Sequence, residues 1–171
     1  MIKSEKKLKE LVLLLNKDNK ILISQAIESL RDERPFEGVI GLLISIYDKS
    51  DDHSIRNTIM LFMNDIKDES ARPEVMAEIK KQWNSATISM LVSSCWQSGL
   101  DYSDYYTDFL EVFLSNDYVT AIECLTVISD SAKNITRAEK DKIIRKIADN
   151  PLPVVDEKSA LTLELISILE K

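Results

Sequence analysis

The stretch Ala26–Leu30 (AIESL) returns almost unchanged as Ala121–Leu125 (AIECL), 95 residues further along the chain. One third of this separation is about 32 residues, which is the size of a repeat made of two helices. Intermediate copies are therefore expected near positions 58 and 90. Thr58–Phe62 (TIMLF) fits this expectation well, whereas Met90–Ser94 (MLVSS) agrees only in being helical and partly apolar. The similarity of the two stretches favours an array of stacked helix pairs over a compact helical bundle, which is the alternative architecture.

The composition of the chain also indicates helices. Hydrophobic residues make up 44% and charged residues 30% of the 171 residues, a balance typical of folded chains rather than disordered ones. Only three glycines and four prolines are present, which is too few for the many tight turns of a sheet-rich protein. Leucine, isoleucine, alanine, glutamate and lysine fill the long stretches between turns. We therefore expect an all-α protein.

Apolar residues recur at helical spacing along nearly the whole chain, as in Ile55, Ile59, Phe62 and Ile66. Polar turns separate these stretches, which fall into five antiparallel helix pairs. The expected pairs cover approximately residues 4–31, 36–67, 71–98, 102–132 and 136–170. Asn150–Pro153 is the one stiff connector, and no other linker is visible, so a single domain is expected over residues 1–171.

Individual residues predict where several helices begin and end. Pro35 and Pro73 suit the opening of a helix, because proline fits the first helical turn. Gly99 suits the position just after a helix, where a left-handed backbone is common. Thr136 completes a glycosylation sequon that begins at Asn134, but a role as the N-terminal cap of the next helix explains it better.

Residues 35–67 carry the clearest motif in the chain. Phe36–Ile44 supplies paired aliphatic residues, Asp52 lies in the turn that follows, and Ile55 with Arg56 opens the second helix. This pattern resembles a HEAT repeat, in which an aspartate in the turn precedes a Val-Arg-like pair. The resemblance implies a right-handed α-α superhelix, a solenoid of about five antiparallel helix pairs. It implies architecture and says little about function.

Two interpretations of Arg56 remain open. Its guanidinium group has the donor geometry to bind an anion or a phosphate. The resemblance implies instead that Arg56 pairs with acidic turn residues of an adjacent repeat. We favour the second interpretation, because a rigid guanidinium fork suits fixed carboxylates.

His53, the only histidine, lies beside Asp51 and Asp52 and is the first candidate for chemistry. Imidazole and carboxylate groups bind metals, and a positioned histidine acts as a general base. Consecutive residues in a turn point in different directions, however, and no second histidine or cysteine lies nearby. We therefore interpret the segment as a helix start capped by Asp51, Asp52 or Ser54, and expect no catalytic, cofactor-binding or metal-binding residue.

An aromatic cluster between the third and fourth expected pairs is the main surface candidate. Trp96, Tyr102, Tyr105 and Tyr106 surround a turn in which burial is not forced, and such residues often anchor a protein partner. The alternative is that they fill the junction between two repeats. Interleaved carboxylates would favour a basic or polar partner, and these are Asp101, Asp104 and Asp108.

Charge and hydropathy exclude several classes of function. The formal net charge of -7 disfavours nucleic-acid binding, which needs a basic surface. No apolar run approaches the ~20 residues of a membrane span, and no signal peptide is visible, so we expect a cytoplasmic protein. Cys95 and Cys124 lack ligand-like spacing, so both are expected as packed, reduced thiols.

Together these features predict a non-enzymatic protein interaction module whose partner is another protein. One alternative is an enzyme that resembles the HEAT-like DNA-alkylation-repair glycosylases, with Trp96 and Asp101 in its site. The acidic charge balance argues against it. The other alternative is a self-assembling structural array. The apolar helix at Leu161–Leu169 would then drive homodimer formation.

Overall fold

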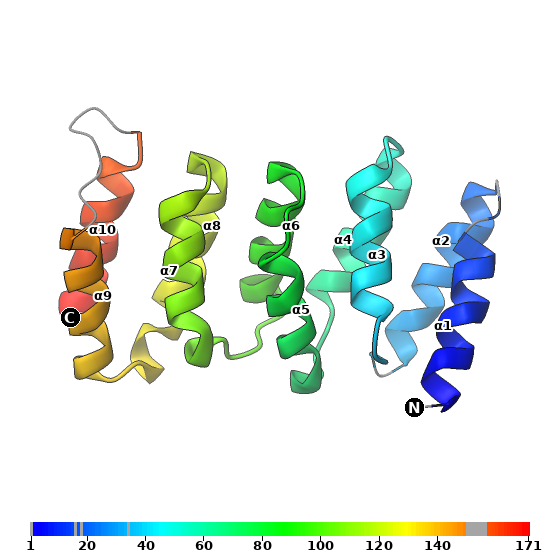
Figure 1. Cartoon of the computed structure of the whole chain (residues 1–171), viewed down its shortest axis with the longest axis horizontal. Coiled ribbons are helices and arrows are strands. Elements are labelled where there is room, and N and C mark those ends of the chain that lie inside the picture. Colours follow the sequence, from blue (N-terminus) through cyan, green and yellow to red (C-terminus); the bar gives the residue numbers. More distant parts are fainter. Residues whose placement is uncertain (1, 16, 18, 34, 150–156) are drawn as a thin grey trace. The chain divides into compact units, whose positions relative to one another are not determined.

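A computed structural model of the chain describes residues 2–15, 17, 19–33, 35–149 and 157–171 (Figure 1). Within these residues the chain forms ten α-helices and four short 3-10 helices and no β-strand. The prediction of an all-α protein is therefore confirmed.

The helices follow one another with short connections. The α-helices are α1 (Ile2–Leu15), α2 (Lys20–Ser29), α3 (Val39–Lys49), α4 (His53–Asn64), α5 (Arg72–Ile79), α6 (Ser85–Gln97), α7 (Tyr106–Ser115), α8 (Tyr118–Ser131), α9 (Arg137–Asp149) and α10 (Ser159–Glu170). The 3-10 helices are η1 (Leu30–Asp32), η2 (Glu69–Ala71), η3 (Ser103–Tyr105) and η4 (Ala132–Asn134). The expected connector Asn150–Pro153 lies outside the described residues.

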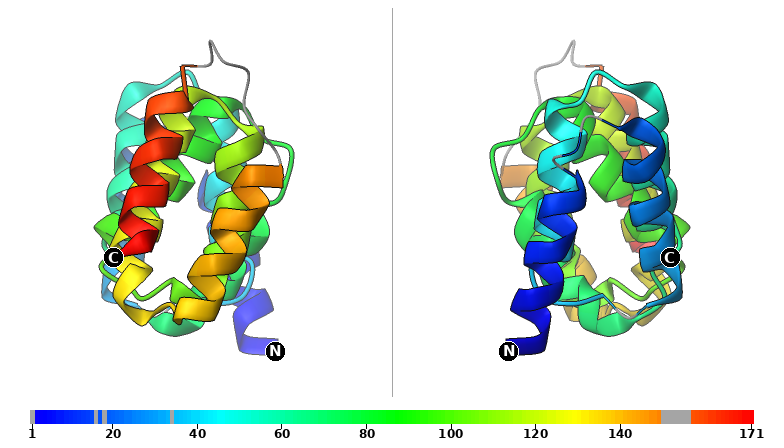
Figure 2. Two further views of the ribbon diagram at one scale, coloured as in Figure 1. Left: turned by 90° about the vertical axis from the view of Figure 1, so that its left-hand side faces the viewer. Right: turned by 90° about the vertical axis from the view of Figure 1, so that its right-hand side faces the viewer.

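The chain divides into two compact units, Met1–Gly99 with α1 to α6 and Leu100–Lys171 with α7 to α10. The expectation of one domain over residues 1–171 stays a prediction. In the first unit, α1 packs on α2, α3 on α4 and α5 on α6, while α4 also contacts α2 and α6, and α3 contacts α5. In the second unit, α8 packs on α7 and α10, and α9 packs on α10. Figure 2 shows α1 beside α2 in its right view and α9 beside α10 in its left view.

The even-numbered helices recur at a nearly constant interval. The helices α2, α4, α6 and α8 begin at residues 20, 53, 85 and 118, which are 33, 32 and 33 residues apart. Ile27, Ile59 and Leu91 lie 32 residues apart on α2, α4 and α6, and all three are fully buried. The interval agrees with the two-helix repeat length expected from the sequence.

The two similar stretches that suggested this length, Ala26–Leu30 and Ala121–Leu125, nevertheless do not occupy equivalent positions in the structure. Ile27 is fully buried, whereas Ile122, which occupies the same position in the second stretch, is 37% exposed. The start of α8 lies 98 residues after that of α2, so an offset of 95 residues is three residues out of register, close to one helical turn. By helix position Ile27 corresponds to Leu125, which is buried, and Ile122 corresponds to Ser24, which is half-buried. Treating the two stretches as copies of one position is therefore wrong.

Polar contacts also join residues about one repeat apart. In the first unit these contacts are Arg31–Asp65, Asn64–Gln97 and Gly41–Glu74, with sequence separations of 34, 33 and 33. In the second unit they are Asp101–Asn134 and Glu111–Lys146, with separations of 33 and 35. Each contact ties a helix or its end to the corresponding element of the next pair in the same unit.

Three predicted helix boundaries are confirmed. Gly99 adopts φ of 72°, and its N–H donates to the carbonyl of Trp96 at 3.1 Å, as expected after a helix. Thr136 caps α9, and the Glu139 carboxylate accepts from its N–H at 2.9 Å, which completes a capping box. Pro73 lies in the first turn of α5, where its missing N–H costs no helical hydrogen bond.

One predicted boundary is corrected. The helix expected from residue 36 begins only at Val39, so Pro35 precedes the helix and does not open it. Gly38 is the N-cap and adopts the left-handed φ of 86°, which favours glycine and keeps the preceding residues out of the helix.

Candidate functional site

The segment around His53 is a helix start, as the sequence predicted. Asp52 is the N-cap of α4, and its carboxylate accepts from the N–H of Ser54 at 2.8 Å and of Ile55 at 3.2 Å. Lys20 on α2 forms an ion pair with the same carboxylate. The hydrogen bond from Lys20, followed by those from the backbone, lowers the pKa of Asp52 below its usual 3.8.

His53 and Arg56 both lie among the first four residues of α4. His53 is exposed at the first position of α4, and the described part of the chain holds no group of three or more metal-ligating side chains. Ile55 is buried, consistent with a structural position. The Arg56 guanidinium carbon lies 4.4 Å from the centre of the Tyr47 ring, a cation–π contact.

This contact corrects the expected pairing of Arg56 with turn carboxylates. The ion pairs that join successive helix pairs in this part of the first unit come instead from Lys20, which binds Asp52, and from Arg31, which binds Asp65. Tyr47 lies on the preceding helix of the same pair, so Arg56 stabilises contact within a pair. The sequence did not reveal this, because the partner depends on which side of α4 faces α3.

The four aromatic residues predicted as partner anchors differ in exposure. Trp96, in the last turn of α6, is 38% exposed and belongs to the first unit. Tyr102, Tyr105 and Tyr106 belong to the second unit, in which Tyr105 and Tyr106 are half-buried. Burial, with a smaller effect from the negative charge of Glu139, raises the pKa of Tyr106 above its usual 10.0.

Tyr102 requires a correction, because it is only 3% exposed. Its ring centre lies 6.0 Å from that of Phe109, in an edge-to-face arrangement, and 6.0 Å from that of Tyr105. Aromatic pairs of this geometry stabilise a folded core. Tyr102 therefore packs within the second unit, and we exclude it from any binding surface; the alternative that the cluster fills the junction between two repeats stays a prediction.

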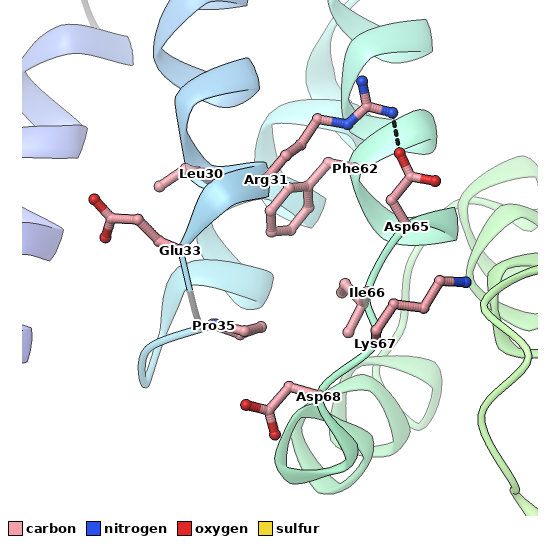
Figure 3. Close-up of a pocket in the computed structure, with 9 residues that line it drawn as sticks. All are labelled: Leu30, Arg31, Glu33, Pro35, Phe62, Asp65, Ile66, Lys67 and Asp68. Carbon is pink, nitrogen blue, oxygen red and sulfur yellow. Dashed lines mark hydrogen bonds and ion pairs between the residues drawn. The ribbon is translucent and has the colours of Figure 1, made fainter.

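A pocket of about 250 Å³ lies between the C-terminal ends of α2 and α4 in the first unit (Figure 3). Its lining includes the buried apolar residues Leu30, Phe62 and Ile66. Arg31 and Asp65 also line it, and Figure 3 shows them pointing toward one another as an ion pair. The pocket has room for one apolar side chain beside charged groups, but it brings together no nucleophile and base.

A pair of carboxylates one helical turn apart on α5 faces the first turn of α3. Glu74 accepts from the N–H of Gly41 at 3.2 Å and also interacts with the N–H groups of Gly38 and Ile40. Burial raises the pKa of Glu74 above its usual 4.5, and the charge of Glu78 adds to this, while the three backbone N–H groups oppose it. The pair holds α5 against α3.

Glu78 approaches α3 even more closely. Its side chain is 5% exposed, and its Oε1 accepts from Lys81 Nζ at 2.6 Å. Its Oε2 is buried and has no hydrogen-bond partner among the described residues. A Cβ atom at position 41 would lie 2.7 Å from Glu78 Oε1, so a larger residue there would force the end of the Glu78 side chain to move.

In the second unit, Lys158 holds α10 against the C-terminal end of α7. Its side chain is buried, and Nζ donates to the carbonyl oxygens of Phe113, Leu114 and Asn116 at 3.1, 2.9 and 3.0 Å. Carbonyls at the end of a helix lack partners within the helix and attract positive charge. No pattern in the sequence indicated this contact, because it joins residues more than 40 positions apart.

The sequence interpretation also missed an exposed apolar group on α8. Val119 is 58% exposed, Tyr118 38% and Ile122 37%. These residues lie in a part of the chain that carries no positive charge: no lysine or arginine occurs between residues 82 and 132. Counting charges along the chain, rather than only its net charge, would have drawn attention to this stretch.

Among the described residues, no helix combines the length and apolar character needed to cross a membrane. Comparison with known proteins adds no family: no family model, no curated protein and no solved structure matches the chain.

Proposed function

We propose that the chain is a non-enzymatic module that binds another protein, built from HEAT-like helix pairs arranged as a right-handed solenoid. The observation that supports this proposal is the regular interval of 32 to 33 residues between the starts of α2, α4 and α6. Contacts one repeat apart, such as Asn64 with Gln97 at 2.8 Å, join these helices. Stacked pairs of this kind present long surfaces on which many small contacts add up to specific binding.

The second helices of the first three pairs expose large apolar side chains. Ile21 and Leu22 on α2 are 70% and 39% exposed, Leu61 on α4 is 41% exposed, and Trp96 on α6 is 38% exposed. Tryptophan and large aliphatic side chains contribute strongly when a partner covers them. We infer that partners bind across the second helices rather than in one deep cleft, and that they do so in the cytoplasm.

The two alternative functions receive less support. A DNA glycosylase needs a basic groove, whereas residues 82–132, which include Trp96 and Asp101, carry seven carboxylates and no lysine or arginine. For self-assembly through α10, the supporting observation is Leu163, which is 69% exposed. A single exposed leucine is ordinary for a monomer, so we rank self-assembly second.

Affinity capture with a double variant tests the proposal. The tagged chain and the variant Leu61→Ala/Trp96→Ala are used to capture proteins from an extract of the native host, and captured proteins are quantified by mass spectrometry. Both substitutions are at exposed sites, so the circular dichroism spectrum should be unchanged. We expect at least one protein to be captured by the parent and to fall about tenfold or more with the variant.

Leu13→Ala is the matched control, because Leu13 is 68% exposed but lies on α1, a first helix. It should leave capture unchanged. Equal capture by parent and double variant, or equal loss with Leu13→Ala, would contradict binding across the second helices.

A further inference from the structure

Positive charge is absent from a long internal part of the chain. All 22 lysines and arginines lie outside residues 82–132, although a stretch of 51 residues would hold six or seven at the mean density. Seven carboxylates fall between residues 101 and 130. The helices α7 and α8 lie within this acidic stretch and form one antiparallel pair of the second unit.

Two lysines from other helices of the second unit reach this pair through contacts with α7, namely Lys146 of α9 and Lys158 at the start of α10. Lys146 pairs with Glu111 of α7 at 2.7 Å, and the buried Lys158 donates to the carbonyls at the end of α7. The sequence of α8 itself contributes carboxylates and no lysine or arginine.

The outward face of α8 is apolar where it begins. Tyr118, Val119 and Ile122 are close together on a helix surface, because residues three and four positions apart are neighbours. All three are exposed, Val119 by 58%. The inward face of α8 is already filled by fully buried side chains, namely Ala121, Cys124 and Ile128. The three exposed residues are therefore not needed to complete the core of the unit.

Carboxylates flank this apolar group. Asp117 is the N-cap of α8, and its side chain accepts from the N–H of Thr120 at 2.8 Å, so its position is fixed. Glu123 follows Ile122 and is half-buried, and Asp130 is exposed near the end of the helix. Exposed apolar side chains flanked by carboxylates form a surface that favours a partner with the opposite charge.

We propose that the α8 surface, defined as Tyr118, Val119, Ile122 and the flanking Asp117 and Glu123, binds a basic amphipathic helix of another protein. The apolar stripe of that helix would cover the three exposed side chains, and its lysines or arginines would face the carboxylates. Nucleic acid is a poor occupant, because α8 itself carries no cation to neutralise phosphate.

Binding of a basic helix by the α8 surface rests on the proposed function. It specifies the class of partner that one face of the module recognises. The length of α8, 14 residues or about 21 Å, sets the length of partner that it can hold. A partner helix of about four turns is enough to span it. A second copy of this chain is the competing occupant, because its first helix is rich in lysine.

A peptide probe tests the charge and shape of the surface directly. The probe is a fluorescein-labelled peptide of about 14 residues made of leucine and lysine, with leucine at helical spacing, and glutamate replaces lysine in the control peptide. Fluorescence anisotropy measures binding to the full chain. We expect the lysine peptide to bind, the glutamate peptide not to bind, and binding to weaken as salt is added.

Two variants then locate the site. Val119→Ser/Ile122→Ser should weaken binding of the lysine peptide about tenfold or more, and Glu123→Lys should also weaken it. Leu163→Ser and Glu164→Lys are matched controls, because both residues are exposed on α10 of the same unit. These controls should change binding less than about twofold. Circular dichroism confirms that each variant is folded.

Three results would overturn the inference: equal binding of the two peptides, unchanged binding by the Val119/Ile122 variant, or an equal loss in the α10 controls. Sedimentation tests the competing occupant, and a dimer that Val119→Ser/Ile122→Ser dissociates would assign the surface to a second copy instead. These failures are distinguishable from failure of the proposed function, because the capture experiment tests Leu61 and Trp96 in the first unit.

Discussion

Replacing Gly41 with alanine tests the packing of α5 against α3. Alanine in place of a glycine inside a helix normally stabilises a protein by about 0.5–1 kcal/mol. Gly41 lies within α3, and its φ is not in the left-handed range, so its backbone tolerates alanine. The new Cβ atom would, however, lie 2.7 Å from Glu78 Oε1 and 3.5 Å from Glu78 Cδ. These distances predict a change of the opposite sign.

The magnitude follows from how firmly Glu78 is held. Its side chain is only 5% exposed, and Oε1 accepts from Lys81 Nζ at 2.6 Å, so moving it strains the packing and disturbs a charged hydrogen bond. Overpacking of this kind costs about 1–3 kcal/mol. After subtraction of the helix-propensity gain, Gly41→Ala should lower the free energy of unfolding by about 0–2.5 kcal/mol.

Tryptophan fluorescence during urea unfolding measures this change in the relevant part of the chain. The only two tryptophans, Trp83 and Trp96, both lie in the first unit, as do Gly41 and Glu78. The free energy comes from linear extrapolation to zero urea. Unfolding of the second unit therefore does not enter the measurement directly.

A double-mutant cycle with Glu78→Ala isolates the clash. Without the carboxylate, Gly41→Ala should stabilise the chain by about 0.5–1 kcal/mol, as in an ordinary helix. The effect of Gly41→Ala on the free energy of unfolding should thus be about 1–3 kcal/mol less favourable in the parent than in the Glu78→Ala background. If Gly41→Ala stabilises the parent as much as it stabilises Glu78→Ala, the predicted clash between position 41 and Glu78 is refuted.

Three further predictions concern individual charged groups. Lys158→Met should lower the free energy of unfolding by about 2–3 kcal/mol, measured by circular dichroism, because it leaves the carbonyls at the end of α7 without their donor; Lys140→Met, at a half-buried position on α9, is the control. The pKa of Glu74 is raised on folding, so ionising it removes stability as pH rises through that pKa. Glu74→Gln should therefore gain stability relative to the parent from pH 4.5 to neutral pH, and a constant difference across this range would contradict the assignment. The pKa of Asp52 is lowered on folding, so its contribution is present above 3.8 and lost as pH falls. The stability advantage of the parent over Asp52→Asn should accordingly shrink in acid, as measured by thermal melting at several pH values.

Periodic patterns predicted the helices well, because they depend on residues close together in sequence. Ile55, Ile59 and Phe62 are all buried on one side of α4, as their spacing indicated. Asp52 likewise acts on N–H groups two and three residues ahead, so its capping role was visible in the sequence. Local interactions of this kind need no knowledge of how helices pack.

Contacts between helices were harder to predict. Tyr102 looked like a surface residue because it lies in a turn, yet the fold brings Phe109 against it. Lys158 was indistinguishable from an exposed lysine until α10 was placed against the end of α7. The similarity of Ala26–Leu30 to Ala121–Leu125 misled for a similar reason, because nearly identical stretches three residues out of register face different surroundings.

The absence of lysine and arginine from residues 82–132 has a practical consequence for mapping partners. Trypsin cuts only after these residues, so cleavage at Lys81 and Lys133 leaves this whole part of the chain as one long peptide. Amine-reactive cross-linkers likewise find no attachment point on α6, α7 or α8. A survey based on lysine chemistry would therefore record partners elsewhere on the chain and miss any partner held by α8. Carbodiimide coupling through carboxylates, followed by cleavage after aspartate or glutamate, reaches the surface that such a survey would overlook.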